Sequence, residues 1–303
     1  MTEKAARPSD RMRGPGLVYF ALIMLMLTSA CQRPTEVPWS SEIEGSVFEV
    51  QVEYQNKSSG DGTTGSSSGR NTLTERIIEV DSKEIIVEYD YAPRPRRYVD
   101  EQPNLIEWEF PATISLKHSD DITLQNIEEI TARNTEWREA AGIPNEACGL
   151  WYFTWNAFKV ECDPNTVIQS LEAFILFDDE IHEGQEIKEF GTLKTGIIKL
   201  VSSSPLTFQA EFEFDPEVIR ESRAEQDVIV AQMMQRETIS LENALEGRAT
   251  EQISGNLTAT WELDDRGRVI KRTRNSNITI ELENGEIEKL SQKQTTTRTL
   301  QAD

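Results

Sequence analysis

Apolar and polar residues alternate along most of the chain, and this alternation predicts β-strands. In residues 48–54, 84–91, 206–214 and 257–263, every second residue is apolar. A period of two places apolar side chains on one face of a strand and polar side chains on the other. The chain is therefore predicted to form a large antiparallel sheet with one buried and one solvated face. Shorter candidate strands lie at 74–80, 106–110, 114–116 and 122–124.

The last part of the chain predicts a three-stranded meander. Strand-like runs at 257–263, 269–282 and 287–300 are separated by Asp265-Arg266-Gly267 and by Asn284-Gly285. Asn-Gly between two alternating runs is a strong signal for a tight β-hairpin. Near the start of the sheet, residues 55–72 are rich in glycine and serine, and we expect them to form a long flexible loop between two strands.

Helical signals are concentrated in the middle of the chain. Residues 134–141 favour a helix that ends at Gly142, and Asp163-Pro164 is typical of a helix start. We therefore predict an α+β fold in which a large curved antiparallel β-sheet, half-barrel-like, receives a helical insert at about 134–176. Residues 228–238 fit both a helix and a strand, and we favour the strand.

The N-terminal residues follow the pattern of an export signal. Three arginines precede an apolar run of about 11 residues, which is too short for a membrane span of roughly 20. Thr28-Ser29-Ala30-Cys31 closes the run and resembles the lipobox of bacterial lipoproteins, although Leu is commonest where Thr28 stands. The resemblance implies lipidation of Cys31. The alternative is an ordinary signal peptide cut after Ala30. Separately, Met12 is the alternative to Met1 as the translation start, because it gives a shorter basic segment before the apolar run.

This resemblance implies a location in the bacterial cell envelope. Residues 1–30 are the predicted signal peptide, residues 31–42 a proline-bearing tether, and residues 43–303 a single α+β domain. In enteric lipoproteins, Asp after the lipidated cysteine favours retention in the inner membrane. Gln32 stands there in this chain and therefore fits an outer-membrane lipoprotein that faces the periplasm or the exterior.

The formal net charge of −22 limits the partners that the domain can bind. The predicted signal peptide carries four basic and two acidic residues, so the mature chain is more acidic still. Such a chain repels nucleic acid and anionic lipid headgroups. We therefore expect no nucleic-acid partner, and membrane attachment through the N-terminal lipid rather than through a basic patch. An apolar ligand or another envelope protein is the expected partner.

Cys148 and Cys162 are the cysteines that follow Cys31. An exported protein meets an oxidising compartment, which favours a disulfide between them. The alternative is a zinc site, but two cysteines with the distant His118 and His182 do not match a zinc pattern. We expect a disulfide and no metal.

Two segments resemble bacterial lipoproteins with the periplasmic lipoprotein-carrier (LolA/LolB-like) half-barrel fold. Residues 177–185 are similar to a helix-to-strand turn with a fixed glycine, although the proline expected in such relatives is missing. Residues 255–269 are similar to hairpins in which Asp and Gly separate two strands. The resemblance implies a concave apolar surface for lipid or acyl chains.

Aromatic and basic residues supply two candidate surfaces. A ligand or partner surface is predicted from a run of aromatic side chains, with packing of the insert onto the sheet as the alternative. This run contains Trp151, Tyr152, Phe153 and Trp155. Basic residues gather in the last three predicted strands, where they would form either a basic stripe or cross-strand ion pairs.

These patterns favour a lipid-anchored envelope lipoprotein that acts as a non-catalytic binding or assembly module without a cofactor. Two alternatives remain open. A lipid or lipoprotein carrier needs an apolar concavity on the inner face of the sheet. A secreted hydrolase needs two carboxylates at a defined separation in a cleft. The densest carboxylate group, Asp178-Asp179-Glu180, lies beside His182, and we interpret both as solvated surface.

Overall fold

The computed structural model describes residues 42–60, 62–81, 83–92, 107–117, 121–153, 157–177, 181–234 and 239–301. All of them belong to one unit, Pro38–Asp303. The predicted signal peptide, Cys31 and most of the predicted tether lie outside the described residues, so the domain boundaries stay a prediction.

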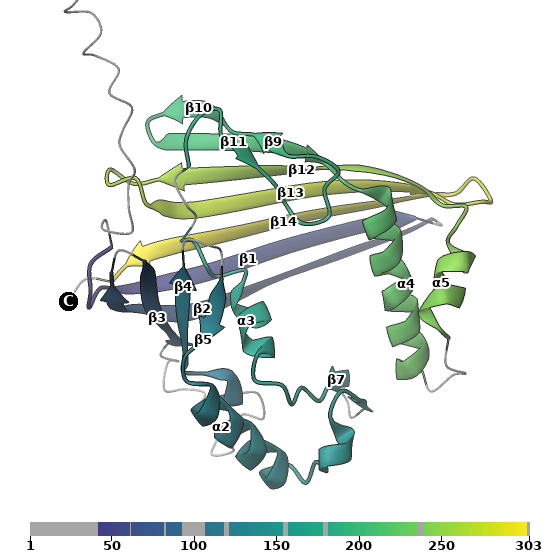
Figure 1. Ribbon diagram of the computed structural model, residues 1–303. Helices are drawn as coiled ribbons and strands as arrows, with labels where there is room; N and C mark the ends of the chain where they lie inside the picture. The colour runs from purple at the N-terminus through teal and green to yellow at the C-terminus, as the bar shows by residue number, and fades with distance from the viewer. Residues whose placement is uncertain are drawn as a thin grey trace, which may run out of the picture. The chain divides into compact units, whose positions relative to one another are not determined.

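Ten strands form one open antiparallel sheet in the order β10-β11-β12-β13-β14-β1-β2-β3-β4-β5 (Figure 1). Two meanders, β1 to β5 and β10 to β14, are joined where the first strand pairs with the last. The predicted antiparallel sheet and its C-terminal meander are confirmed, and the fold is mainly β. The strands are β1 (Val47–Gly60), β2 (Thr63–Val80), β3 (Glu84–Tyr91), β4 (Ala112–Lys117), β5 (Ile122–Leu124), β10 (Lys199–Ser203), β11 (Leu206–Glu213), β12 (Gln252–Leu263), β13 (Val269–Glu281) and β14 (Ile287–Leu300).

The flexible loop expected at 55–72 is wrong, because most of these residues continue the ladder between β1 and β2. Pairing runs from Gln55↔Ser68 to Gly60↔Thr63. On its other side, β1 pairs with β14 as far as Ser59. Residues 55–59 are therefore hydrogen-bonded on both sides and residues 63–72 on one side, which satisfies the backbone of a stretch whose polar side chains form no core. The glycine- and serine-rich composition of this stretch therefore predicted a loop where the structure has paired strands.

Four α-helices occur in the part of the chain that the structure describes: α2 (Ile127–Ala140), α3 (Thr166–Leu171), α4 (Pro216–Met233) and α5 (Leu241–Gly247). Among these residues, none of the helices has the length and apolar character needed to cross a membrane. Short elements complete the fold: η3 (Glu107–Glu109), η4 (Asn145–Ala147), β6 (Trp151–Phe153), β7 (Ala157–Lys159), β8 (Glu186–Ile187) and β9 (Gly196–Ile197).

The helical insert predicted at 134–176 is only partly correct. Helix α2 begins earlier, at Ile127, and the β6–β7 hairpin separates it from α3. The strand predicted at 106–110 is also wrong, since η3 occupies 107–109. The alternating apolar residues Trp108 and Phe110 pack on other elements instead of forming one face of a strand. Trp108 stacks on Trp137 of α2, and Phe110 meets Tyr91 edge-on.

The strand favoured at 228–238 is wrong for the residues that the structure describes there, because α4 extends to Met233. Asp215 caps this helix by accepting a hydrogen bond from the Glu217 backbone N–H at 3.0 Å. The buried residues of the helix, Ala224 and Ala231, are small. Hydrophobic periodicity misses a helix whose packed face lacks large aliphatic side chains.

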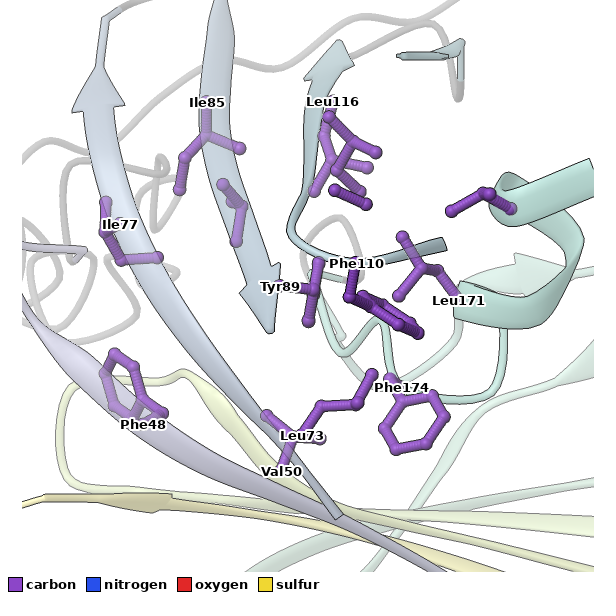
Figure 2. Packing of buried hydrophobic residues seen from close by; sticks show 14 of the residues in the cluster. Phe48, Val50, Leu73, Ile77, Ile85, Tyr89, Phe110, Leu116, Leu171 and Phe174 are labelled. Atoms are coloured by element: carbon purple, nitrogen blue, oxygen red, sulfur yellow. The ribbon is translucent and has the colours of Figure 1, made fainter. Parts of the chain in front are cut away.

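The core lies on one face of the sheet, here called the inner face, and has two parts. The first cluster joins β1 to β5 with residues of α3 and the segment after it, as Figure 2 shows for Leu73, Leu171 and Phe174. The second cluster joins β11, β12 and the start of β13, with Trp261 1% exposed. Their strand residues share one face because they are direct cross-strand partners, as in Val50↔Leu73 and Ala210↔Ala259.

Residues 172–177, here called the strap, connect the two clusters across the sheet. Phe174 belongs to the first cluster and Leu176 to the second. Sheet side chains satisfy the strap backbone between them. Thr296 donates its hydroxyl hydrogen bond to the carbonyl oxygen of Ala173 at 2.8 Å, and Arg272 donates to that of Glu172 at 3.4 Å. The strap is not part of a β-ladder, and side chains of β13 and β14 provide hydrogen bonds to its backbone instead.

Gly255 of β12 gives a test of this packing. A Cβ added there would lie 2.6 Å from the backbone oxygen of Asn277, which cannot rotate away. We expect Gly255→Ala to lower the free energy of unfolding by about 1–3 kcal/mol, measured by denaturant titration. Gly247→Ala is the matched control, because a Cβ there has nothing within 4 Å and Ala favours helices. Equal stability of the two variants would contradict the close approach of β12 and β13.

Candidate interaction surface

Arg298 of β14 is the centre of a buried charge cluster on the inner face. Its Nε donates to Glu75 Oε1 of β2 at 2.6 Å. Its Nη1 and Nη2 donate to the two carboxylate oxygens of Glu42 at 2.6 and 3.0 Å. The other oxygen of Glu75 accepts from the Tyr89 hydroxyl at 2.9 Å. The side chains of Arg298, Glu75 and Glu42 are 2%, 0% and 5% exposed, so the guanidinium and both carboxylates are shielded from water.

Aromatic rings and a second arginine surround this cluster. The guanidinium carbon of Arg298 lies 3.7 Å from the ring centre of Phe48 and 4.7 Å from that of Phe177 in the strap. Arg268, in the turn between β12 and β13, forms a bridge to Asp264 at 2.7 Å and approaches Glu42 at 3.8 Å. The cluster therefore joins the start of the described chain to both meanders and to the strap.

The pKa shifts in the cluster follow from burial and charge. Burial raises the pKa of Glu75, and Arg298 opposes that rise. Burial also raises the pKa of Tyr89 far above its usual value, and the neighbouring carboxylate adds to the rise, so the hydroxyl stays a donor. Burial acts to lower the pKa of Arg298, but the two carboxylates outweigh it and raise the pKa. Arg298 is therefore a permanent cation.

This cluster does not have the properties of a catalytic carboxylate pair. Glu42 and Glu75 both bind Arg298, and both residues are buried. A general acid or nucleophile must reach substrate. The geometry fits a structural role, in which the cluster fixes where the chain enters the sheet.

Several basic residues of the C-terminal meander form ion pairs, but not with Glu281, Glu286 and Glu288, the partners that the cross-strand alternative names; Glu288 pairs with Arg223 of α4 instead. Arg274 pairs with Glu189, and Lys271 pairs with Glu262 at 3.4 Å. Several partners lie outside the meander, which the sequence pattern could not reveal. Lys293 is exposed, on the face of β14 opposite the core.

The predicted disulfide is confirmed. Cys148 and Cys162 are bonded, with a Cα–Cα distance of 5.5 Å, and flank the β6–β7 hairpin. Backbone hydrogen bonds between residues 149–150 and Val160 continue this pairing toward the disulfide. Asn134 of α2 donates its side-chain amide to the Glu161 carbonyl at 3.0 Å, so the hairpin is attached to the helix.

The aromatic candidates are only partly described. Trp151 is half-buried in β6, and β6 contacts α4. Tyr152 and Phe153 belong to the same strand, but only their backbone is described. Trp155 lies outside the described residues. The prediction of a ligand or partner surface at this hairpin therefore stays a prediction.

The candidate carboxylate group also falls outside what the structure describes. Asp178, Asp179 and Glu180 are not among the described residues, whereas His182 is and has an exposed side chain. Within the described ranges, no group of three His, Cys, Asp or Glu residues could hold a metal ion.

A surface that the sequence analysis missed lies along the β10 edge of the sheet. Exposed apolar side chains gather between residues 190 and 201, and Phe190 is 88% exposed. We call this set the edge surface, and its apolar members are Phe190, Leu193, Ile197, Leu200 and Val201. Five exposed apolar side chains within twelve residues mark this segment as a candidate interaction surface.

Backbone contacts place the edge surface along the outer side of β11. Leu193 donates its N–H to the Glu213 carbonyl at 2.9 Å, at one end of β11. Gly191, next to Phe190, accepts from Asp215 at 2.8 Å beside the same end. Toward the other end, Leu200 pairs with Phe208, and a bulge follows. Residues 196–198 are hydrogen-bonded to the β8 segment, whereas β10 is the end strand of the described sheet. An end strand can accept a partner, because its backbone groups are unpaired on one side.

A weak signal for this surface was present in the sequence. Residues 187–201 read Ile-Lys-Glu-Phe-Gly-Thr-Leu-Lys-Thr-Gly-Ile-Ile-Lys-Leu-Val and are rich in apolar residues without a regular period. Their burial alternates irregularly: Ile198 is fully buried in the second cluster, whereas Ile197 is 55% exposed. Its apolar composition predicts that the whole segment is buried, and only the tertiary structure shows which of its side chains are exposed to solvent.

Comparisons with known proteins do not assign the chain to a family. No family model matches it, and no curated protein matches it. Similar solved structures include one reported for lipid–protein interactions in lipovitellin, with a TM-score of 0.40, 8% identity, and coverage of 86% of this chain and 25% of that chain. The chain thus spans a quarter of the lipovitellin chain.

Two further similar structures are more distant. The attachment invasion locus protein Ail of Yersinia pestis has a TM-score of 0.18 and 7% identity, with 84% of this chain and 99% of that chain covered. A DUF1329 family protein from Desulfovibrio piger has a TM-score of 0.13 and 9% identity, with 84% and 85% covered. At these TM-scores the likenesses carry no argument about fold or function.

The charge cluster gives a test in which stability depends on pH. Removing Arg298 leaves the Glu75 carboxyl buried without its cation, so its pKa rises further. The folded state then holds a proton that the unfolded chain releases, and stability is lost as the pH rises. We expect Arg298→Met to lower the free energy of unfolding by about 3–5 kcal/mol at neutral pH, and by less near pH 5, in denaturant titrations.

Lys293→Met is the matched control, since it removes one exposed positive charge from the same strand. We expect it to change the free energy of unfolding by less than about 0.5 kcal/mol at both pH values. If Arg298→Met lost the same stability at acidic and neutral pH, the loss would come from packing rather than from the unpaired carboxylates.

Proposed function

We propose that the protein is an exported bacterial envelope lipoprotein, anchored by a lipid on Cys31, that acts as a non-catalytic binding or assembly module. The edge surface is the observation that supports a binding role. Its apolar side chains are exposed, and two of them, Leu200 and Val201, belong to β10, the strand at the end of the described sheet. The location and the anchor rest on the resemblance of Thr28-Ser29-Ala30-Cys31 to a lipobox.

Coverage of the apolar clusters supports binding of an apolar partner at the edge surface rather than on the inner face of the sheet. Apolar residues of the first cluster are covered by α3 and the strap, as Leu171 and Phe174 show. In the second cluster, Leu176 and Ile198 cover the strands in the same way. The protein's own chain therefore occupies the apolar parts of the face that a ligand would otherwise use.

Polar side chains continue the inner face beyond the strap. On the neighbouring strands β13, β14 and β1, residues at this level of the sheet remain wholly or partly exposed. They are Ser276, Gln292, Gln294, Tyr54 and Asn56. A carrier of lipid or acyl chains needs apolar lining, because an unpaired polar group costs free energy beside an alkyl chain. These residues support a binding module more than the carrier alternative.

The anchor is tested by acyl labelling of the full chain in bacteria. We expect Cys31→Ala to abolish incorporation of radiolabelled palmitate and to move the protein out of the membrane fraction. Replacing Cys148 and Cys162 with Ser is the matched control, because the disulfide lies in the domain and is predicted to have no role in anchoring. Unchanged labelling of the Cys31 variant, or lost labelling of the control, would refute the proposed anchor.

A further inference from the structure

We propose that a polar region of the inner face, between the strap and α4, is a second binding site and takes an uncharged glycan. We call this region the polar floor, and its members are Tyr54, Asn56, Ser67, Ser276, Gln292 and Gln294. The inference goes beyond the proposed function, because it needs neither the lipid on Cys31 nor the edge surface.

The pairing register places the floor residues side by side across four strands. Gln292 of β14 is the direct partner of Asn56 of β1 on one side and of Ser276 of β13 on the other. Asn56 in turn pairs with Ser67 of β2. Asn56 lies on the inner face because it stands four residues after the buried Val52, and side chains alternate along a strand. The steps between these four strands make the floor roughly 14 Å wide.

Contacts to other elements bound the floor at both ends along β14. Thr296 donates to the strap at one end, and Glu288 pairs with Arg223 of α4 at 2.8 Å at the other. The strand between Thr296 and Glu288 is about 26 Å long, at roughly 3.3 Å for each residue. The floor is therefore an elongated strip, a shape that suits a linear chain of sugar rings.

The polar floor has hydrogen-bonding groups that the protein itself does not use. Four of its side chains have no hydrogen-bond partner in the part of the chain that the structure describes: Tyr54, Ser276, Gln292 and Gln294. Asn56 donates to the Ser67 hydroxyl at 3.3 Å, but its own carbonyl oxygen is buried and unpaired among the described residues. Amides and hydroxyls supply both donors and acceptors, as the hydroxyls of a sugar do.

Tyr54 adds an aromatic surface to the floor. A Cβ on Gly69 of β2 would lie 2.2 Å from the hydroxyl oxygen of Tyr54 and 2.3 Å from its ring carbon Cζ. The ring therefore leans across β2, where the glycine leaves room for it, and it stays partly exposed. The electron-rich face of an aromatic ring attracts the C–H groups of a sugar ring. An aromatic ring beside amides and hydroxyls thus matches both the C–H groups and the hydroxyls of a sugar.

The charges around the floor favour an uncharged ligand. None of the floor side chains carries a charge at neutral pH. Arg274 and Glu288, the nearest charged inner-face residues on β13 and β14, both take part in ion pairs. Glu172 of the strap is exposed, and the net charge of the chain is −22. This negative charge repels nucleic acid and acidic polysaccharides, whereas a neutral glycan is not repelled.

An acyl chain and a peptide match the floor less well than a glycan. An acyl chain would cover the amides of Gln292 and Gln294 without pairing them, which costs free energy. An extended peptide gains its main-chain hydrogen bonds by pairing with the edge of a sheet. The floor instead offers side chains, on the face of strands β14 and β1 that are already paired on both sides.

Binding of neutral oligosaccharides to the full-length protein tests this proposal. The protein is purified in a detergent without a sugar headgroup and studied by calorimetric titration and saturation-transfer NMR. The probes are cellohexaose, maltohexaose and chitohexaose, with the anionic hexagalacturonate for comparison. We expect at least one neutral probe to bind, with the strongest saturation on its ring C–H groups, and the anionic probe not to bind. Binding of no neutral probe, or equal binding of the anionic one, would overturn the proposal.

Variants at Tyr54 and Gly69 locate the site. We expect Tyr54→Leu to weaken oligosaccharide binding about three- to tenfold, because it removes the aromatic ring. Gly69→Ala should weaken it similarly, since the new methyl group displaces the tip of the Tyr54 ring while every floor side chain remains. Ser68→Ala, on the outer face of the same strand, is the matched control and should bind like the parent. Denaturant titration verifies that all three variants are folded.

A pair of glutamines separates the two faces of the sheet. Gln292 and Gln55 are exposed on neighbouring strands, but Gln292 lies on the inner face and Gln55 on the outer face. We expect Gln292→Ala to weaken binding about three- to tenfold through lost hydrogen bonds, and Gln55→Ala to leave it unchanged. If both variants bound equally, or if no floor variant weakened binding, the sugar would lie elsewhere and the proposal would fall.

The outcomes also separate this inference from the proposed function. Oligosaccharide binding is measured without a membrane, so Cys31→Ala should leave it unchanged. If Cys31 is acylated and no oligosaccharide binds, the anchor stands and the glycan site is wrong. If oligosaccharides bind to the floor and Cys31 is not acylated, the glycan site stands and the anchor is wrong. If an uncharged peptide of alternating Ser and Asn binds in place of the oligosaccharides, the floor is a peptide site and the glycan proposal falls.

Discussion

The pairing of the first strand with the last is the constraint on which the rest of the structure depends. β1 and β14 join two meanders that would otherwise be separate sheets. Arg298 strengthens the junction, because it reaches from β14 to Glu75 on β2 and to Glu42 at the start of the described chain. These contacts span sequence separations of 223 and 256 residues, so closing them costs chain entropy that the buried ladder must offset.

The junction also explains why the inner face is divided. Two apolar clusters lie on either side of strands whose side chains at the centre are arginine, threonine and glutamine. Thr296 and Arg272 among them donate hydrogen bonds to the strap, which itself connects the clusters. The polar centre is thus needed to hold irregular backbone across a sheet, and it limits how far an apolar ligand could extend along the face.

Sequence patterns predict the strands of this protein well where burial is one-sided. The alternation at Phe48, Val50 and Val52 corresponds to inner-face residues that are all buried. The hydrophobic pattern fails to predict an element where that element is stabilised by contacts other than the burial of large apolar side chains. Residues 55–59 are strand because two neighbours hydrogen-bond to them, and α4 packs through alanine. The disulfide followed from compartment chemistry, whereas the edge surface depends on which strand ends the sheet, and no local pattern records that.

The position of Glu42 has a mechanical consequence. If the chain is held at its N-terminus, any force on the domain arrives first at the Glu42–Arg298 pair and then at β1. β1 is not an edge strand, since it is hydrogen-bonded to β14 and β2 along most of its length. A pull along this strand would load many hydrogen bonds at once in shear instead of peeling them singly. A chain held in this way would transmit tension to an internal strand of the sheet rather than to an edge strand.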